Sequence, residues 1–100
     1  MIRDNEVNDT GDTAAPFDDN FNDGIFVGAF TAGTLVRDNL VQRNTGDGIE
    51  VQASNARVGG NRAFNNGDFG IDAAAGVTDL GGNVASGNGN PLQCRNVFCL

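Results

Sequence analysis

The fold is decided by the stretch Asn-Thr-Gly-Asp-Gly-Ile-Glu-Val at residues 44–51, which returns 22 positions later as Asn-Gly-Asp-Phe-Gly-Ile-Asp-Ala at residues 66–73. The Gly-Ile step occurs once more, in Asp-Gly-Ile-Phe-Val at residues 23–27, after about a dozen inserted residues. A fixed period of roughly 20 to 50 residues is typical of solenoids and other stacked repeats. The sequence therefore predicts a solenoid whose turns contain about 22 residues.

Asparagines recur at a second fixed place in each period. Asn39, Asn61 and Asn83 are 22 residues apart, and Asn5 lies 34 residues before Asn39. Asparagine suits a sharp turn because it tolerates left-handed backbone angles, and its side-chain amide can bond the equivalent groups above and below. We therefore expect Asn39, Asn61 and Asn83 to form an internal ladder.

Apolar residues alternate over short runs within each period, as in Ile49 and Val51. Such alternation indicates strands with one buried face. No stretch has helical spacing over three turns, and the runs are separated by glycine and asparagine, which make up 15 and 14 of the 100 residues. The chain is therefore predicted to be all-β, a parallel β-helix with two or three short strands per turn and with Ile25, Ile49 and Ile71 in one interior stack.

A leucine-rich repeat is the competing architecture, because Val36, Asn39 and Val41 satisfy a fragment of its consensus. The rest of that consensus fails. The upstream leucines are missing, and residues 65–68, Asn-Asn-Gly-Asp, form turns where a leucine-rich repeat needs its outer helix. The β-helix is therefore the favoured interpretation.

The chain also resembles a known family. Residues 44–51, 58–63, 66–71 and 80–99 are similar to right-handed parallel β-helix repeat proteins of the pectate-lyase-like superfamily, and the ending resembles the C-terminal part of secreted bacterial members. The resemblance covers most of the chain from Phe21 onward. It implies a right-handed parallel β-helix at an extracellular or cell-surface location. It implies no particular substrate, because this fold carries lyases, hydrolases, epimerases, adhesins and proteins without known activity.

Two parts are expected: β-helix coils over residues 1–90, with a loop insertion at about residues 11–23, and a C-terminal cap over residues 91–100. Cys94 and Cys99 are the only cysteines. They are too few for a four-ligand zinc site and wrongly spaced for a Cys-x-x-Cys redox motif. We expect them to form a disulfide that pins a small loop over the last coil, with two reduced, buried thiols as the alternative.

Nothing comparable covers the first coil. Residues 2–5, Ile-Arg-Asp-Asn, already match the middle of a coil. We therefore expect the C-terminal part of a longer β-helix, whose N-terminal edge is covered by upstream coils or by another chain. The opening residues also lack the basic and apolar regions of a signal peptide. A longer precursor with its signal upstream would reconcile this with a cysteine pair typical of an oxidising, extracellular compartment.

Composition excludes several functions. The chain has 6 Arg, no Lys and 13 Asp or Glu, a formal net charge of −7, and no His. Without His there is no Ser-His-Asp or Cys-His catalytic group and no imidazole metal ligand. A nucleic-acid partner is not expected, because phosphate binding requires a basic surface. A membrane span is not expected either, because no apolar run reaches about 18 residues.

The first candidate site is a pair of carboxylates, Glu50 and Asp72, at equivalent positions after the Gly-Ile steps. Successive strands place such side chains about 5 Å apart on an exposed sheet face. There they could share a proton or bind a cation, which makes them weak catalytic candidates. The alternative is a solvated acidic face.

The second candidate site lies in and beside the insertion. Asp18, Asp19, Asn20 and Asp23 offer oxygen ligands suited to calcium. The spacing resembles that of an EF-hand loop, but the glycine arrives one position late and the final glutamate is replaced by Ala29. A surface loop without metal is the alternative, so calcium is a possible cofactor rather than a required one.

These observations predict a structural or surface-binding β-helix module without a complete catalytic site, and the resemblance names polysaccharide as a possible partner. Three catalytic motifs of the superfamily are absent: the Gly-His-Gly of polygalacturonases, the Asp-Pro-His of alginate epimerases and the Arg-x-Pro-x-x-Arg of pectate lyases. The alternative is part of a carbohydrate-active enzyme, a polysaccharide lyase or hydrolase, whose main catalytic residues lie upstream.

Overall fold

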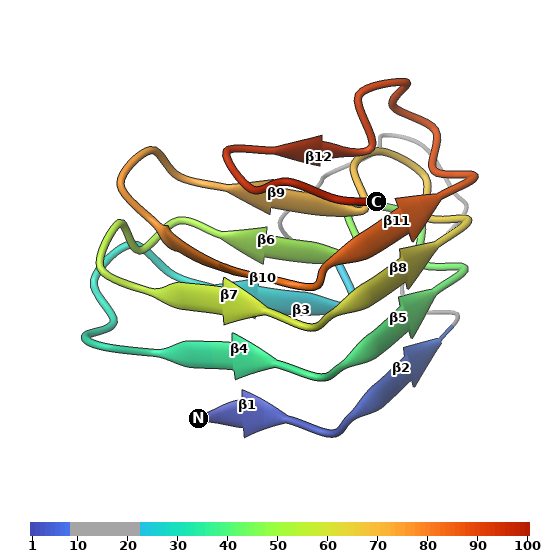
Figure 1. Cartoon of the computed structure of the whole chain (residues 1–100). Coiled ribbons are helices and arrows are strands. Elements are labelled where there is room, and N and C mark those ends of the chain that lie inside the picture. The colour runs from blue at the N-terminus through green and yellow to red at the C-terminus, as the bar shows by residue number, and fades with distance from the viewer. Residues whose placement is uncertain (9–22) are drawn as a thin grey trace.

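The computed structural model describes residues 1–8 and 23–100, and within them twelve short strands wind into a parallel β-solenoid (Figure 1). The strands form three four-stranded sheets, and every paired strand runs parallel to its neighbour. Each turn of the chain adds one strand to each sheet. The predicted all-β parallel solenoid is therefore confirmed.

The three sheets are named here in chain order. Sheet 1 contains β1 (Ile2–Arg3), β4 (Leu35–Arg37), β7 (Arg57–Gly59) and β10 (Thr78–Gly81). Sheet 2 contains β2 (Glu6–Asn8), β5 (Leu40–Gln42), β8 (Arg62–Phe64) and β11 (Val84–Ser86). Sheet 3 contains β3 (Ile25–Val27), β6 (Ile49–Val51), β9 (Ile71–Ala73) and β12 (Cys94–Arg95).

The core consists of aligned apolar side chains that point inward from all three sheets. Ile25, Ile49 and Ile71 stand in register on adjacent strands of sheet 3, as the period predicts. Val36 pairs with Val58 in sheet 1 in the same way, and both are fully buried. Because each strand has only two to four residues, one or two inward positions per strand fill the interior. The core is therefore a narrow column of small and medium side chains.

The asparagine ladder lies at the corner between sheets 1 and 2. Asn39 donates its backbone N–H and its Nδ2 to Oδ1 of Asn61, at 3.1 and 3.0 Å, and Asn61 donates the same two groups to Asn83, at 3.0 and 3.2 Å. The second Nδ2 hydrogen of Asn61 reaches the carbonyl of Val36 at 3.0 Å. All three asparagines are buried, so these bonds satisfy polar groups that water cannot reach. The predicted ladder is confirmed.

A second ladder, which the sequence alone did not assign, lies between sheets 2 and 3. Asn44 donates its backbone N–H and Nδ2 to Oδ1 of Asn66, and Asn66 repeats the pattern to Asn88, all at 2.8 to 3.1 Å. The left-handed backbone position at both corners falls one residue before the ladder asparagine, as at Asp38 (φ 57°) and Asn65 (φ 57°). The sharp turn is therefore made by the preceding residue, which leaves the ladder asparagine to supply the hydrogen bonds.

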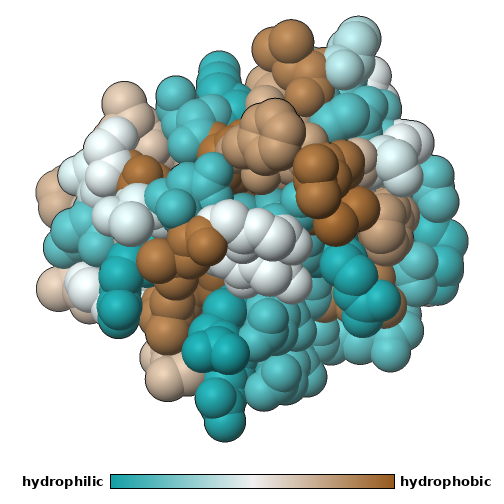
Figure 2. All heavy atoms as spheres, in the orientation of Figure 1, coloured by the Kyte–Doolittle hydropathy of each residue, from teal (hydrophilic) through white to brown (hydrophobic). Residues whose placement is uncertain are grey.

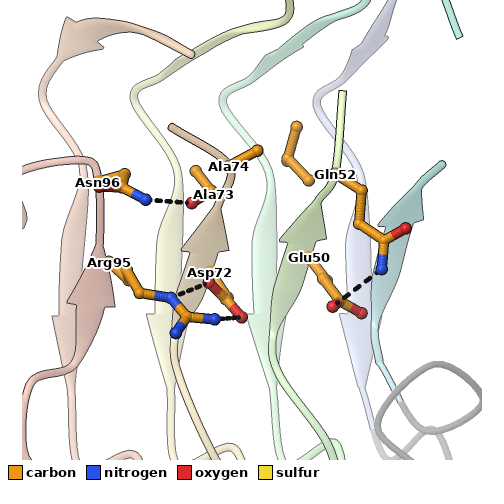
Figure 3. Close-up of a pocket in the computed structure, with 8 residues that line it drawn as sticks. Glu50, Gln52, Asp72, Ala73, Ala74, Arg95 and Asn96 are labelled. Carbon is orange, nitrogen blue, oxygen red and sulfur yellow. Dashed lines mark hydrogen bonds and ion pairs between the residues drawn. The ribbon is translucent and has the colours of Figure 1, made fainter. Parts of the chain in front are cut away.

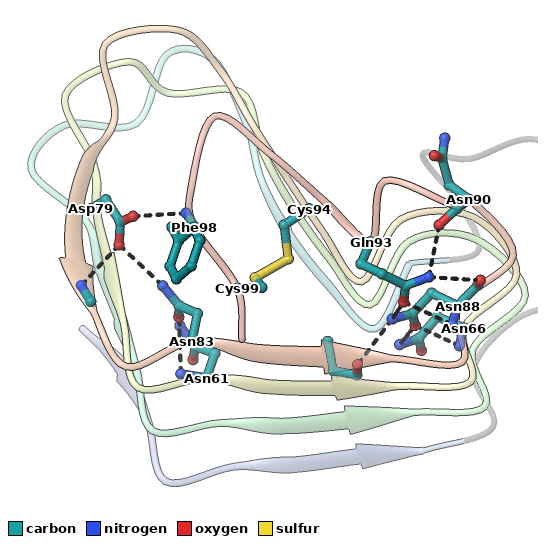
Figure 4. Close-up of a disulfide and its surroundings, with 12 residues drawn as sticks. Asn61, Asn66, Asp79, Asn83, Asn88, Asn90, Gln93, Cys94, Phe98 and Cys99 are labelled. Atoms are coloured by element: carbon teal, nitrogen blue, oxygen red, sulfur yellow. Dashed lines mark hydrogen bonds between the residues drawn. A yellow bond between two sulfur atoms is a disulfide. The ribbon is translucent and has the colours of Figure 1, made fainter.

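The C-terminal end of the solenoid is closed by a loop that the Cys94–Cys99 disulfide ties together (Figure 4). This confirms the predicted disulfide. Gln93 terminates the second ladder, because its Oε1 accepts the backbone N–H and Nδ2 of Asn88 at 3.1 and 2.8 Å. Asp79 acts similarly at the first ladder, where it accepts Nδ2 of Asn83 at 3.3 Å and the N–H of Phe98 at 2.8 Å.

Figure 2 shows a largely hydrophilic surface on which apolar residues gather in separate patches, several of them toward the capped end. Large apolar side chains exposed in the last part of the chain are Leu80, Leu92, Phe98 and Leu100. Among the described residues, no helix has the length and apolar character needed to cross a membrane.

Candidate functional site

The outer face of sheet 3 carries an open depression of about 370 Å³ (Figure 3). Its walls come from three successive strands and the turns that follow them. The lining residues are Glu50, Val51, Gln52, Asp72, Ala73, Ala74, Arg95 and Asn96. The strand alternation explains this composition, since residues that flank an inward-pointing isoleucine must point outward. The depression therefore combines carboxylate, amide and guanidinium groups.

Glu50 and Asp72 are register neighbours on β6 and β9, as the sequence predicts, but each side chain has its own partner. Arg95 of β12 donates hydrogen bonds to both carboxylate oxygens of Asp72, from Nε to Oδ1 at 2.7 Å and from Nη2 to Oδ2 at 2.6 Å. Arg95 also stacks over the ring of Phe69, 4.9 Å from its centroid. The hydrogen bonds to Asp72 and its charge raise the pKa of Arg95 above its usual value.

Glu50 turns instead toward two aspartates at the corner that leads into sheet 3. One carboxylate oxygen from each of Asp23, Asp47 and Glu50 lies within 4.8 Å of the other two. Asp23 Oδ1 accepts the backbone N–H of Asp47 at 2.8 Å, and Asp47 Oδ1 accepts the N–H of Phe69 at 2.9 Å. Each aspartate side chain thus accepts a hydrogen bond from the backbone of the next turn. Oε1 of Glu50 accepts a hydrogen bond from Nε2 of Gln52 at 3.4 Å.

Burial makes the charged form of Asp23 unfavourable. Asp23 is 7% exposed and Asp47 is 1% exposed. Burial raises the pKa of Asp23 to about 9, and the contact with Glu50 and the charge of Asp47 add to the rise, against the lowering effect of the Asp47 N–H. This corner of the molecule therefore favours a bound positive charge, whether a proton or a metal cation.

The calcium candidates divide between described and undescribed residues. Asp23 is described, and it contributes to the cluster with Asp47 and Glu50. Asp18, Asp19 and Asn20 lie outside the described residues, so their role as ligands stays a prediction.

Sequence reasoning missed two residues of this region. Asp47 stands before its Gly-Ile step as Asp23 does, and this shared position was the available signal that their carboxylates stack. The sequence contains a weaker indication that Arg95 belongs to this region. It pairs with Asp72 in a step of 23 rather than 22 residues, so the repeat alone places it one position out of register.

The family is now decided by a match along nearly the whole chain. The model of the family described as "Right handed beta helix region" matches residues 1–96. The chain belongs to this right-handed β-helix family. No curated protein and no solved structure gives a significant match to it. The handedness expected from the resemblance is thereby confirmed, and the pectate-lyase-like, secreted and polysaccharide expectations stay predictions.

Proposed function

We propose that this β-helix is an extracellular binding module that holds a neutral polysaccharide along the outer face of sheet 3. The observation that carries the proposal is the depression over β6, β9 and β12, in which polar side chains repeat from strand to strand. Parallel strands stack about 4.8 Å apart. A linear polymer that runs along the stacking direction would therefore meet one polar side chain from each strand, Glu50, Asp72 and then Arg95.

The side chains of the depression suit hydroxyl groups. Gln52 and Asn96 present amides, Arg95 presents a guanidinium, and Glu50 presents an acceptor. Phe26 continues the same column on β3, in register with Glu50, and the residue is 43% exposed. An exposed ring beside hydrogen-bonding groups provides an apolar face for a sugar ring.

Charge favours a neutral rather than an acidic polymer. The chain carries a formal charge of −7, and the one arginine of the depression is already paired with Asp72. A polyanion would meet an unfavourable potential over this face. The same ion pair supports binding rather than hydrolysis as the proposal, because a carboxylate gripped by Arg95 is poorly placed to exchange protons with a substrate.

Affinity electrophoresis tests the proposal, with galactomannan, polygalacturonate and chitosan each cast in the gel. We expect galactomannan to retard the protein, and Gln52→Ala or Arg95→Gln to reduce the retardation at least threefold. Arg37→Gln is the matched control, since Arg37 forms the equivalent surface ion pair with Asp38 at 2.8 Å on sheet 1. Equal retardation by polygalacturonate, or equal loss in the control, would refute the assignment.

The extracellular location is supported by the Cys94–Cys99 disulfide, because such bonds persist mainly in oxidising compartments. The open ladder end at Asn5 supports further coils or a partner chain. Asn5 donates its N–H and Nδ2 to Asn39 at 3.0 and 3.1 Å, and Asn5 is exposed, whereas Oδ1 of Asn39 and of Asn61 accepts from the preceding turn. Intact mass of the native protein, with and without alkylation of thiols, tests both points. A free thiol pair would contradict the first, and a monomer of 10.4 kDa would contradict the second.

A further inference from the structure

The cluster of Asp23, Asp47 and Glu50 contains two oxygen atoms that lack a hydrogen-bond donor. Oδ2 of Asp23 and Oε2 of Glu50 are both buried, and no donor among the described residues reaches either atom. Asp23 as a whole is 7% exposed, so its second oxygen cannot be satisfied by bulk water. A buried carboxylate oxygen without a partner is costly, because the group has lost its hydration.

The position of these oxygens within the cluster indicates what satisfies them. They belong to two of the three side chains, Asp23, Asp47 and Glu50, that each bring one carboxylate oxygen within 4.8 Å of the others. Two acceptors cannot bond each other unless a positive species lies between them. The choice is therefore between a proton shared by two carboxylates and a cation held by all three.

We propose that Asp23, Asp47 and Glu50 form a binding site for one calcium ion. Three carboxylates supply up to six oxygens, and calcium accepts six to eight, from one or both oxygens of a carboxylate and from water. Calcium–oxygen distances of about 2.5 Å allow ligand atoms up to about 5 Å apart, whereas magnesium at about 2.1 Å allows about 4.2 Å. The 4.8 Å limit of the cluster is within the range that calcium accepts.

Existing hydrogen bonds hold the ligands in place without using the orphaned oxygens. Asp23 and Asp47 each accept a backbone N–H through Oδ1, and Glu50 accepts Nε2 of Gln52 through Oε1. A bound ion would connect the residue that leads into β3 with the strand β6 of the following turn. Calcium would thus link two adjacent turns of the solenoid. This role does not depend on the polysaccharide proposal.

Equilibrium dialysis of the full chain against calcium alone, at pH 7.5, tests the site directly. We expect one ion per chain with a dissociation constant of about 0.1 to 1 mM, the range of extracellular calcium modules. Asp23→Asn and Glu50→Gln should each weaken binding at least tenfold. Glu6→Gln is the matched control, because Glu6 is an exposed strand glutamate on sheet 2, and it should leave calcium affinity unchanged.

Each alternative outcome overturns the proposal. Absence of saturable binding would assign the two oxygens to a shared proton, and binding retained in both variants would place the ion elsewhere in the chain. Tighter binding of magnesium than of calcium would also refute it. If a variant fails to fold in chelator, the wild-type melting temperature decides, since it should rise by several degrees in 5 mM calcium and fall back when chelator is added.

Discussion

Asn61 donates two hydrogen bonds to the same oxygen of Asn83, the residue 22 positions later, and receives two in the same way from Asn39. One buried side chain therefore satisfies polar groups on three consecutive turns. This linkage holds successive turns in register, because a shift by one residue would leave buried donors and acceptors unpaired.

Replacing Asn61 with alanine should destabilise the protein strongly. The change removes the acceptor for two Asn39 donors, leaves the carbonyl of Val36 without its Nδ2 donor, and takes one of the two donors from Oδ1 of Asn83, which keeps the backbone N–H of residue 61. We expect the free energy of unfolding in urea to fall by about 3 kcal/mol or more. Asn5→Ala, at the exposed end of the ladder, should cost less than about 1 kcal/mol. Equal losses would show that the interior ladder bonds are not the dominant contribution.

Gly48 lies where two turns of the backbone approach closely. A Cβ atom there would be 2.6 Å from the carbonyl oxygen of Gly70 and 2.8 Å from Cγ2 of Val41. Gly48→Ala should therefore lower the free energy of unfolding by about 1 to 3 kcal/mol, because neither neighbour is a flexible chain end. Gly28→Ala is the control, with 3.7 Å to the nearest ring atom of Phe26, and should be nearly neutral. Thermal melting of both variants checks this.

The disulfide should make a modest contribution to the free energy of unfolding, because the loop that it closes is short. Cys94 and Cys99 are five residues apart, for which the loop-entropy model gives about 2 kcal/mol. Urea unfolding of the wild-type protein should show a loss of that order when reductant is added. A Cys94→Ser, Cys99→Ser double variant should have the same free energy of unfolding as the reduced wild-type protein, and reductant should not change it. A wild-type midpoint that reductant leaves unchanged would contradict this role of the cap.

Asp23 should make stability depend on pH when divalent cations are removed. Its pKa of about 9 in the folded protein exceeds the unfolded value of 3.8, so between these pH values the folded state binds the extra proton. The stabilising contribution is complete below about pH 4 and is lost as the pH rises toward 9, at up to about 1.4 kcal/mol per pH unit. Urea unfolding at several pH values in chelator measures this slope.

Asp23→Asn should flatten the slope and leave the protein more stable than wild type near pH 9, since an amide stays neutral and can donate to Glu50. Asp4→Asn is the control, because Asp4 is an exposed aspartate paired with Arg3 at 3.1 Å. An identical slope in wild type and Asp23→Asn would show that other groups carry the pH dependence.

The repeat made much of the fold predictable. Strands that recur every 22 residues must stack in register, so Ile25, Ile49 and Ile71 could be assigned to one column from their spacing alone. Buried asparagines at the same interval could be assigned to a ladder for the same reason. In a solenoid the contacts between turns follow the sequence period, which makes long-range structure readable as local repetition.

The contacts within the candidate site were less predictable, because the partner of each charged side chain depends on places where the chain departs from that period. Glu50 and Asp72 were predicted to stand about 5 Å apart on one sheet face, as a weak candidate pair or as part of a solvated acidic face, and they are neighbours in register. Asp72 nevertheless forms its ion pair with Arg95, 23 residues later in the chain. Glu50 lies instead beside Asp23, on the turn that follows the insertion. Equivalent backbone positions do not determine which carboxylates share a partner.

The sequence by itself determined the parallel solenoid, its period and the first asparagine ladder, and it favoured a disulfide between Cys94 and Cys99 over two reduced thiols. Only the tertiary structure decided that Asp23, Asp47 and Glu50 meet with two unpartnered oxygens while Arg95 neutralises Asp72. The physical reason is that the repeat period specifies which backbone positions stack. The partner of a charged side chain depends instead on distance and burial, and these depend on the places where the chain departs from the period.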